Sequence, residues 1–248
     1  MGCQIQGKCN NFDIEFVDTS LTRRATLGNQ SGRGKNAVNR AYAISLPNRN
    51  TMFAVLFEVQ PKPERWDDYL RHAGALRPEL LKIDGFLDNR RFGSRRQPGR
   101  LLSLSLWRDV KAVIRWRTQA AHHAIQIAGR QEIFSDYHLR VGEVVRENGA
   151  DLPQARFDVT ETGSAQAASV IEAPRLETPP TADGLLDWDM FDGITVPDSR
   201  LMLLSWRDAD AMFGWTDRGG DMRRDVRIVR DYGMNARAEA PQYHAPVD

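Results

Sequence analysis

The stretch FGSRRQPGRLLSLSLWRDVKAVIRW, residues 92–116, decides the fold, because residues 191–215 repeat it without a gap. The shared positions are Phe92, Pro98, Leu102, Leu104, Trp107, Arg108, Asp109, Ala112 and Trp116, which recur as Phe191, Pro197, Leu201, Leu203, Trp206, Arg207, Asp208, Ala211 and Trp215. Two tryptophans at matching places are rarely obtained by chance. The sequence therefore predicts a duplicated supersecondary unit.

Each copy is typical of a strand that enters a helix. In the first copy, residues 101–107 form a short apolar run, and Asp109 follows as a favourable helix-start residue. Alternation along the strand places Leu102, Leu104 and Leu106 on one face and Leu101 and Trp107 on the other. Both faces are apolar, which predicts a strand covered on two sides.

Residues 52–146 contain one complete unit. Residues 52–59 are typical of a strand, and an apolar helical stripe follows as far as Ile83, with Pro78 predicting a kink or a split near Arg77. Strands are predicted over 85–95 and 100–107, a helix or a pair of helices over 109–129, and a fourth strand over 133–146. The order βαββαβ is the ferredoxin-like α+β arrangement, an antiparallel sheet with both helices on one face.

The second face of this predicted sheet would be bare. Because the strands are apolar on both sides, we expect that face to pack on another sheet, from a second chain or from the second repeat. The protein is therefore expected to be a homodimer or an intramolecular pseudo-dimer.

The rest of the chain divides into four segments. Residues 1–51 are rich in Asn, Gly, Arg, Ser and Thr, which predicts disorder or a misassigned leader before a natural start at Met52. Residues 147–168 are a predicted linker, and 169–234 a degenerate second module whose first helix is shortened or lost. Its prolines Pro174, Pro179 and Pro180 stand where that helix would be. Residues 235–248 are a predicted polar tail on the surface.

Charge and hydropathy exclude several classes of partner. The 34 basic and 33 acidic side chains leave a net charge of +1, so no global field attracts nucleic acid or an anionic membrane. No apolar run approaches the roughly 20 residues that span a bilayer, and the first residues lack the apolar core of a secretory signal. Cys3 and Cys9 have no neighbouring histidine and are weak evidence for a metal site. We expect a cytoplasmic protein without nucleic-acid or membrane partners.

Several segments of residues 52–146 occur in the same order in a known family. They are MFAVLFEVQPKP, LRPELLKIDGF and LLSLSLWRD, then Trp116, His122, GRQEIF and DYHLRV. In these segments the first unit resembles the antibiotic biosynthesis monooxygenase (ABM) family of dimeric α/β barrels. The resemblance implies a pocket between sheet and helices where a small aromatic or quinonoid molecule is oxidised by O2, commonly without a flavin, a metal or another cofactor. The protein would supply a base and a dry cavity.

Two neighbouring histidines are candidates for that base. His122 lies six residues after Trp116, where the resemblance places a histidine. Helical periodicity favours His123 instead, because on one unbroken helix it shares a stripe with Trp116. A break near Gln119 would reset the phase, so both histidines stay open as catalytic candidates. Either one can also be a purely structural histidine that caps or pairs on a helix.

Three aromatic residues are candidates for substrate binding. Trp116 can stack on an aromatic substrate, although its recurrence as Trp215 also fits a packing role. Tyr69 and Tyr137 could donate hydrogen bonds in the cavity, but no pattern in the sequence places them there. The arginines between residues 90 and 96 are interpreted as a solvated strand edge.

Two other functions compete with cofactor-independent oxidation. A non-catalytic barrel protein that binds a small molecule or has a structural role has the same fold, because fold does not fix function. Relatives that bind or degrade haem use an Asn on the first strand, where this chain offers Glu58. Their Trp-to-His interval is also longer than that from Trp116 to His122. Haem is therefore the weakest of the three alternatives.

Overall fold

The computed structural model describes residues 51–154, 167–175, 177–217 and 219–241, which include the predicted elements of both repeats. The expectations for residues 1–50, for residues 155–166 of the predicted linker and for the last residues of the tail lie outside this range. Within the described range, no helix combines the length and the apolarity needed to cross a membrane.

The first half of the described chain has the predicted βαββαβ order, with the second helix divided in two. Its elements are β1 (Phe53–Pro61), a 3-10 turn (Pro63–Arg65), α1 (Trp66–Leu81), β2 (Phe86–Ser94), β3 (Leu101–Trp107), α2 (Val110–Thr118), α3 (Ala120–Ala128), a π turn (Gly129–Ile133) and β4 (Phe134–Glu147). Gln119 is extended, with φ −61° and ψ 129°, and so ends α2 and begins α3.

The split predicted at Pro78 is wrong, because α1 runs through Pro78 without interruption. A proline in a helix leaves the carbonyl four residues earlier without its donor. That residue is Gly74, and both Gly74 and Pro78 are exposed. Water can therefore solvate the free carbonyl on the outer side of the helix, and the helix continues.

The second half has strands where the first half has them but lacks the first long helix. Its elements are β5 (Ala150–Asp151), β6 (Ala167–Pro174), β7 (Leu185–Gly193), β8 (Arg200–Trp206), α4 (Ala209–Gly214) and β9 (Gly220–Gly233). As expected from the prolines, the described residues between β6 and β7 contain no helix. The short strand β5 lies inside the predicted linker, where it pairs with the end of β4.

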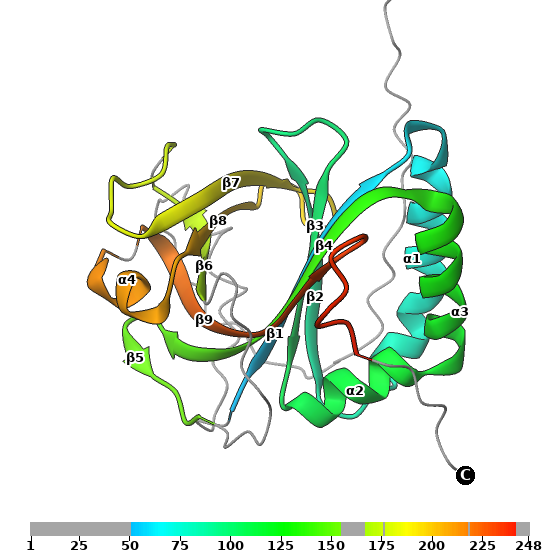
Figure 1. Cartoon of the computed structure of the whole chain (residues 1–248), viewed down its shortest axis with the longest axis horizontal. Helices are drawn as coiled ribbons and strands as arrows, with labels where there is room; N and C mark the ends of the chain where they lie inside the picture. Colours follow the sequence, from blue (N-terminus) through cyan, green and yellow to red (C-terminus); the bar gives the residue numbers. More distant parts are fainter. Residues whose placement is uncertain (1–50, 155–166, 176, 218, 242–248) are drawn as a thin grey trace, which may run out of the picture. The chain divides into compact units, whose positions relative to one another are not determined.

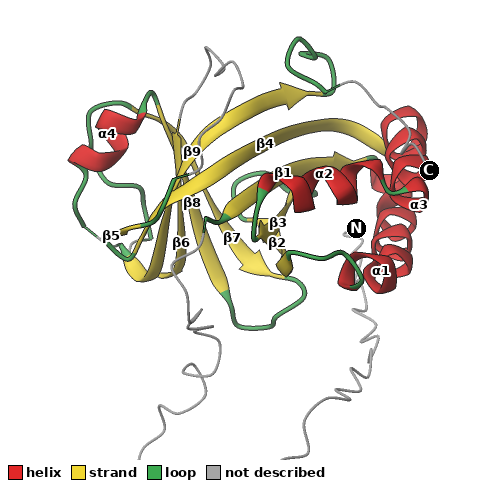
Figure 2. Ribbon diagram, turned by 90° about the horizontal axis from the view of Figure 1, so that it is seen from below, coloured by secondary structure: helices red, strands yellow, loops and turns green. Residues whose placement is uncertain are grey.

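The strands of both halves form one antiparallel sheet that closes on itself. The order is β1-β3-β2-β7-β8-β6-β9-β4-β5, and β1 also pairs with β4, so every strand except β5 belongs to a closed ring. The halves meet at two seams, a short one between β2 and β7 and a long one between β4 and β9. Figures 1 and 2 show α1, α2 and α3 together on one side of this barrel and α4 on the other.

The interior of the barrel is the largest hydrophobic core and takes residues from both halves. Leu102, Leu104 and Leu106 of β3 meet Leu201 and Leu203 of β8 there. The predicted faces of β3 are confirmed, because Leu101 and Trp107 turn outward and pack in the clusters under the helices. The face of the first half's strands that has no helices is thus covered by the strands of the second half of the same chain. The two halves are also joined edge to edge, because their strands belong to one sheet.

Candidate functional site

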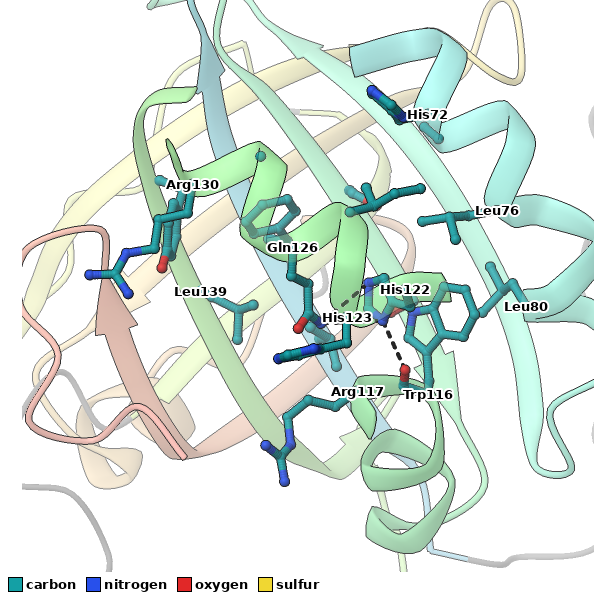
Figure 3. Close-up of a pocket in the computed structure, with 18 of the residues that line it drawn as sticks. His72, Leu76, Leu80, Trp116, Arg117, His122, His123, Gln126, Arg130 and Leu139 are labelled. Atoms are coloured by element: carbon teal, nitrogen blue, oxygen red, sulfur yellow. Dashed lines mark hydrogen bonds between the residues drawn. The ribbon is translucent and has the colours of Figure 1, made fainter. Parts of the chain in front are cut away.

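A cavity of about 420 Å³ lies between the outer face of the first half's strands and helices α1, α2 and α3. Its floor includes Val55, Phe57, Asn89, Arg91, Ser103 and Leu139, and its helical wall includes Tyr69, His72, Leu76, Trp116, His122 and Gln126. Figure 3 shows Trp116, His122 and Gln126 side by side, with Leu76 of α1 across from them. The cavity is therefore where the resemblance implied a substrate pocket.

His122 is held in one tautomer by the end of the preceding helix. Its Nδ1 lies 2.8 Å from the carbonyl oxygen of Trp116, and because a carbonyl only accepts, Nδ1 carries the proton and donates it. Nε2 is then an unprotonated acceptor, 3.4 Å from the amide nitrogen of Gln126 (Figure 3). The imidazole stacks on the Trp116 indole with centroids 4.1 Å apart.

Burial controls the charge of this imidazole. It lowers the pKa of His122 from 6.5 to about 4, although the hydrogen bond to the Trp116 carbonyl works in the opposite direction. The ring is therefore neutral at physiological pH and keeps its lone pair on Nε2, which lies next to the Gln126 amide. Such a group can accept a proton from a bound molecule.

The break at Gln119 positions this histidine. The Gln119 side chain accepts from the backbone N–H of His122 at 2.7 Å, as an N-cap does at the start of α3. Because α3 starts anew at Gln119, both His122 and His123 line the cavity. A helix without this break would have turned only His123 inward. His122 is the one stacked on Trp116, which lines the cavity beside it.

Both tyrosine candidates also line the cavity. Tyr69 of α1 is buried, and burial raises the pKa of its hydroxyl while the neighbouring Arg91 side chain opposes that rise. Tyr137 of β4 accepts a hydrogen bond from Arg237 through its hydroxyl oxygen. In contrast, Trp107 and Trp206 are fully buried core residues, as their positions at strand ends predict.

The sequence interpretation missed two contributions to the cavity. Arg91 lines its floor and is not part of a solvated strand edge. Alternation could have found it, since Phe92 faces the barrel interior and its neighbour must face the helices. The tail, predicted to lie on the surface, reaches the cavity through Arg237 and Pro241, and the backbone N–H of Met234 donates to Tyr137 at 3.0 Å.

The residues present do not fit the haem-degrading arrangement. From the first strand, only Val55 and Phe57 line the cavity, because Glu58 turns to the opposite face and pairs with Arg140 at 2.6 Å. The face of the His122 ring is covered by Trp116, and Gln126 stands next to Nε2. Among the described residues, no cluster of three or more His, Cys, Asp or Glu could hold a metal ion.

Comparisons with known proteins identify relatives. The family model for antibiotic biosynthesis monooxygenase matches residues 52–127. A protein of Pyricularia oryzae named jasmonate monooxygenase ABM is 39% identical over 216 residues, which cover 79% of this chain and 99% of that protein. A solved structure from Shewanella oneidensis is 14% identical, covering 38% of this chain and 91% of its own, with a TM-score of 0.36. An anthrone oxidase-like protein is 10% identical, covering 78% and 97%, with a TM-score of 0.34.

Proposed function

The chain belongs to the antibiotic biosynthesis monooxygenase family, and from this premise we propose that it is a monooxygenase that uses O2 to oxidise a small, mainly apolar molecule between the sheet and α1, α2 and α3. The observation that carries the proposal is the state of His122, which is neutral, tautomerically fixed and placed in the wall of a cavity large enough for such a molecule. Oxidation by O2 without a cofactor requires a base in a site that is shielded from water.

In the proposed reaction, His122 removes a proton from an activated CH2 group of the substrate through Nε2. The resulting carbanion reduces O2, and its carbon forms a bond to oxygen. The O–O bond then breaks, one oxygen atom stays on the carbon as a carbonyl, and the other leaves as water with the two hydrogens of the CH2 group. This stoichiometry balances without a flavin, a metal or an external reductant, which supports a cofactor-independent reaction.

The low pKa of His122 limits which molecules can react in this way. An imidazole whose pKa is about 4 is a weak base, so the carbanion or phenolate must be stabilised by delocalisation. Anthrones meet that condition through a CH2 group between two aromatic rings. Hydroquinones meet it through a phenolate, whose ring C–H carbon reacts with O2 to give a hydroxyquinone and water. The aromatic lining also favours a flat ring, since Trp116, Phe57, Phe134 and Tyr137 all line the cavity. An aromatic or quinonoid substrate is therefore the first candidate.

A jasmonate is the second candidate. The relative that shares 39% identity over almost its whole length carries that substrate in its name. The basic floor residue Arg91 supports a substrate with a carboxylate, which a jasmonate has and an anthrone lacks.

Oxygen uptake tests the proposal. We expect substrate-dependent uptake with a panel of anthrones, hydroquinones and jasmonic acid, and incorporation of one atom of isotopically labelled O2 into the product. His122→Gln should lower the rate by about 100-fold or more, because general-base catalysis typically contributes that much. The matched control is His138→Gln, which replaces a histidine outside the cavity and should keep the activity. Uptake with no member of the panel, or uptake indifferent to His122, contradicts an enzymatic role and favours a binding or structural protein.

We also infer that the two halves, 52–146 and 169–234, are tandem ABM-like modules and that the second is degenerate. In each half, the backbone N–H of the arginine that follows one strand donates to the carbonyl of the glycine just before the neighbouring strand. Arg108 after β3 donates to Gly85 before β2 at 2.8 Å, and Arg207 after β8 donates to Gly184 before β7 at 2.7 Å. Because the barrel closes within one chain, a single chain would imitate the dimer of single-module relatives. Light scattering should give the mass of one chain, and a dimer mass would contradict this inference.

A further inference from the structure

The charges that line the cavity are strongly one-sided. The described lining residues include five arginines and three histidines and no Asp or Glu. The chain as a whole has almost equal numbers of acidic and basic side chains. A cavity lined by basic and not by acidic side chains attracts an anion, because the low dielectric of its walls strengthens the electric field of these side chains.

Arg91 is the basic group of the floor. Its backbone is fixed by the second half, since its N–H donates to the Thr195 hydroxyl at 3.0 Å and its carbonyl accepts from Ile194 at 2.8 Å. Its side chain lies in the cavity beside the Tyr69 hydroxyl. The Nε atom is buried and has no hydrogen-bond partner within the described chain. The Nε atoms of Arg100 and Arg140 are buried without a hydrogen-bond partner among the described residues in the same way, so what sets Arg91 apart is the place of its side chain in the cavity.

The neighbouring arginines show what Arg91 lacks. Arg90 pairs with Glu172 at 2.7 Å, Arg95 with Glu177 at 3.4 Å and Arg96 with Asp187 at 3.2 Å. No salt bridge of the described residues includes Arg91, although Arg90 and Arg91 are adjacent on β2. The alternation of the strand sends Arg90 to the carboxylates of the second half and Arg91 to the cavity.

Arg91 and His122 line the same cavity but lie beside different hydrophobic clusters. Tyr69, next to Arg91, belongs to the cluster around Val59 and Leu101, and Trp116, next to His122, packs on the cluster around Leu80 and Trp107. One molecule that fills the cavity can therefore contact both groups.

We propose that the substrate is an organic anion whose carboxylate binds the Arg91 guanidinium and the Tyr69 hydroxyl, with its oxidisable carbon at His122. The inference deepens the proposed function and rests on it for the oxidation, while the anion site itself concerns binding alone. The forked guanidinium donors match the two oxygens of a carboxylate. The exposed arginines Arg77 and Arg130 line the same cavity and add to its attraction for an anion.

Matched acid and ester pairs test the site. The probes are jasmonic acid with methyl jasmonate and 2-naphthoic acid with methyl 2-naphthoate, which differ within each pair by the charge. Binding is followed by quenching of tryptophan fluorescence or by calorimetry, without turnover. In the wild-type protein, at least one acid should bind about tenfold or more tightly than its ester, the range of a charge-assisted hydrogen bond. Equal binding of acid and ester in both pairs, or no binding of either acid, would overturn the inference.

Two variants and one control test whether Arg91 causes the tighter binding of the acid. Arg91→Gln should abolish the difference in affinity between acid and ester and leave the affinity for the ester within about twofold. Arg91→Lys, which keeps the charge but loses the fork, should retain part of this difference and shows that the site still folds. Arg175→Gln is the matched control, because Arg175 is exposed on the second half and pairs with Asp221 at 3.4 Å, so the preference should stay as in the wild type. A preference that survives Arg91→Gln contradicts the assignment.

The two proposals fail separately. Tighter binding of an acid that depends on Arg91, without any oxygen uptake, supports the anion site and contradicts the monooxygenase function. Oxygen uptake with neutral anthrones or hydroquinones, without preference for the acids, supports the function and contradicts the anion site.

Discussion

Acidification should destabilise the protein through His122. Burial lowers the pKa of this imidazole from 6.5 to about 4 in the folded chain. In the unfolded chain the same group titrates near its ordinary value. Between these two values the unfolded chain binds a proton that the folded chain does not bind. The free energy of unfolding therefore falls as the pH falls, and the change is complete once the pH is below about 4.

The size of the effect follows from the two pKa values. With 6.5 for the unfolded and about 4 for the folded chain, linkage predicts that His122 lowers the free energy of unfolding by about 2 kcal/mol between pH 7 and pH 5. The full loss at lower pH is about 3 kcal/mol. These figures are large enough to resolve by urea unfolding, where extrapolation errors are a fraction of them.

The assay compares the wild type with His122→Gln and with His72→Gln at both pH values. Glutamine can still donate a hydrogen bond to the Trp116 carbonyl but does not titrate. His122→Gln should therefore lose about 2 kcal/mol less on acidification than the wild type does. His72→Gln replaces a histidine of α1 in the same cavity and should keep the wild-type loss, because His122 is intact. If the wild type and His122→Gln lose the same free energy, the buried and neutral state of His122 is wrong.

Four further outcomes follow from the described contacts. Because His122 is neutral above a pKa of about 4, kcat/KM should keep its value down to pH 5 and fall only as the pH approaches 4, as a pH–rate profile would show. Gly85→Ala and Gly184→Ala place a methyl group 2.7 Å and 2.4 Å from the side chains of Ala112 and Ala211 at φ +89° and +77°, so each should cost about 2 kcal/mol in urea unfolding. Asp109→Ala and Asp208→Ala each remove an N-cap and should each cost about 1 kcal/mol, whereas an unchanged midpoint would show that the caps are dispensable. Burial raises the pKa of Glu172, but Arg90 and Arg224 outweigh this effect and hold the pKa at about 2. The ionised carboxylate therefore stabilises the fold above pH 4.5, and its contribution is lost toward pH 2. Glu172→Gln should lower the free energy of unfolding by about 2 kcal/mol at pH 7 and by much less at pH 2, as urea unfolding would show.

Local patterns carried most of the fold that could be predicted. The alternation of Leu102, Leu104 and Leu106 assigned both faces of β3, and Asp109 marked the start of α2. The closure of the barrel had no comparable signal, because it depends on pairing between strands far apart in the sequence. Three residue pairs join β2 to β7, and a register that short leaves no pattern in either strand. The uninterrupted α1 was mispredicted because the effect of Pro78 depends on whether the freed carbonyl faces water.

The candidate site shows the same division between local and long-range information. The cavity is lined by His122, His123, Trp116, Tyr69 and Tyr137. No sequence pattern placed the two tyrosines there, because they come from α1 and β4, which are far apart in the sequence. Arg91 and the tail were missed for another reason. A run of arginines is usually solvated, and a polar tail usually lies on the surface. Only the packing of the helices and of β9 shows that these particular groups face an enclosed space.

The carbonyls of the two repeated tryptophans have different hydrogen-bond partners. At each copy the tryptophan carbonyl accepts a side-chain hydrogen bond, from His122 at 2.8 Å in the first half and from Arg223 at 2.7 Å in the second. Arg223 is buried, lies over the Trp215 ring and pairs with Asp225 at 2.7 Å. Its guanidinium therefore has a structural role.

His122 also donates to a tryptophan carbonyl, at the end of the preceding helix α2, but uses only Nδ1 to do so. The structural role considered for this histidine and the proposed catalytic role are therefore compatible, because the hydrogen bond that fixes the ring also fixes the tautomer that leaves Nε2 as an acceptor. An arginine has no acceptor and cannot serve as a base at any accessible pH. In the proposed mechanism, Arg223 therefore cannot take the part of His122 at the second tryptophan carbonyl.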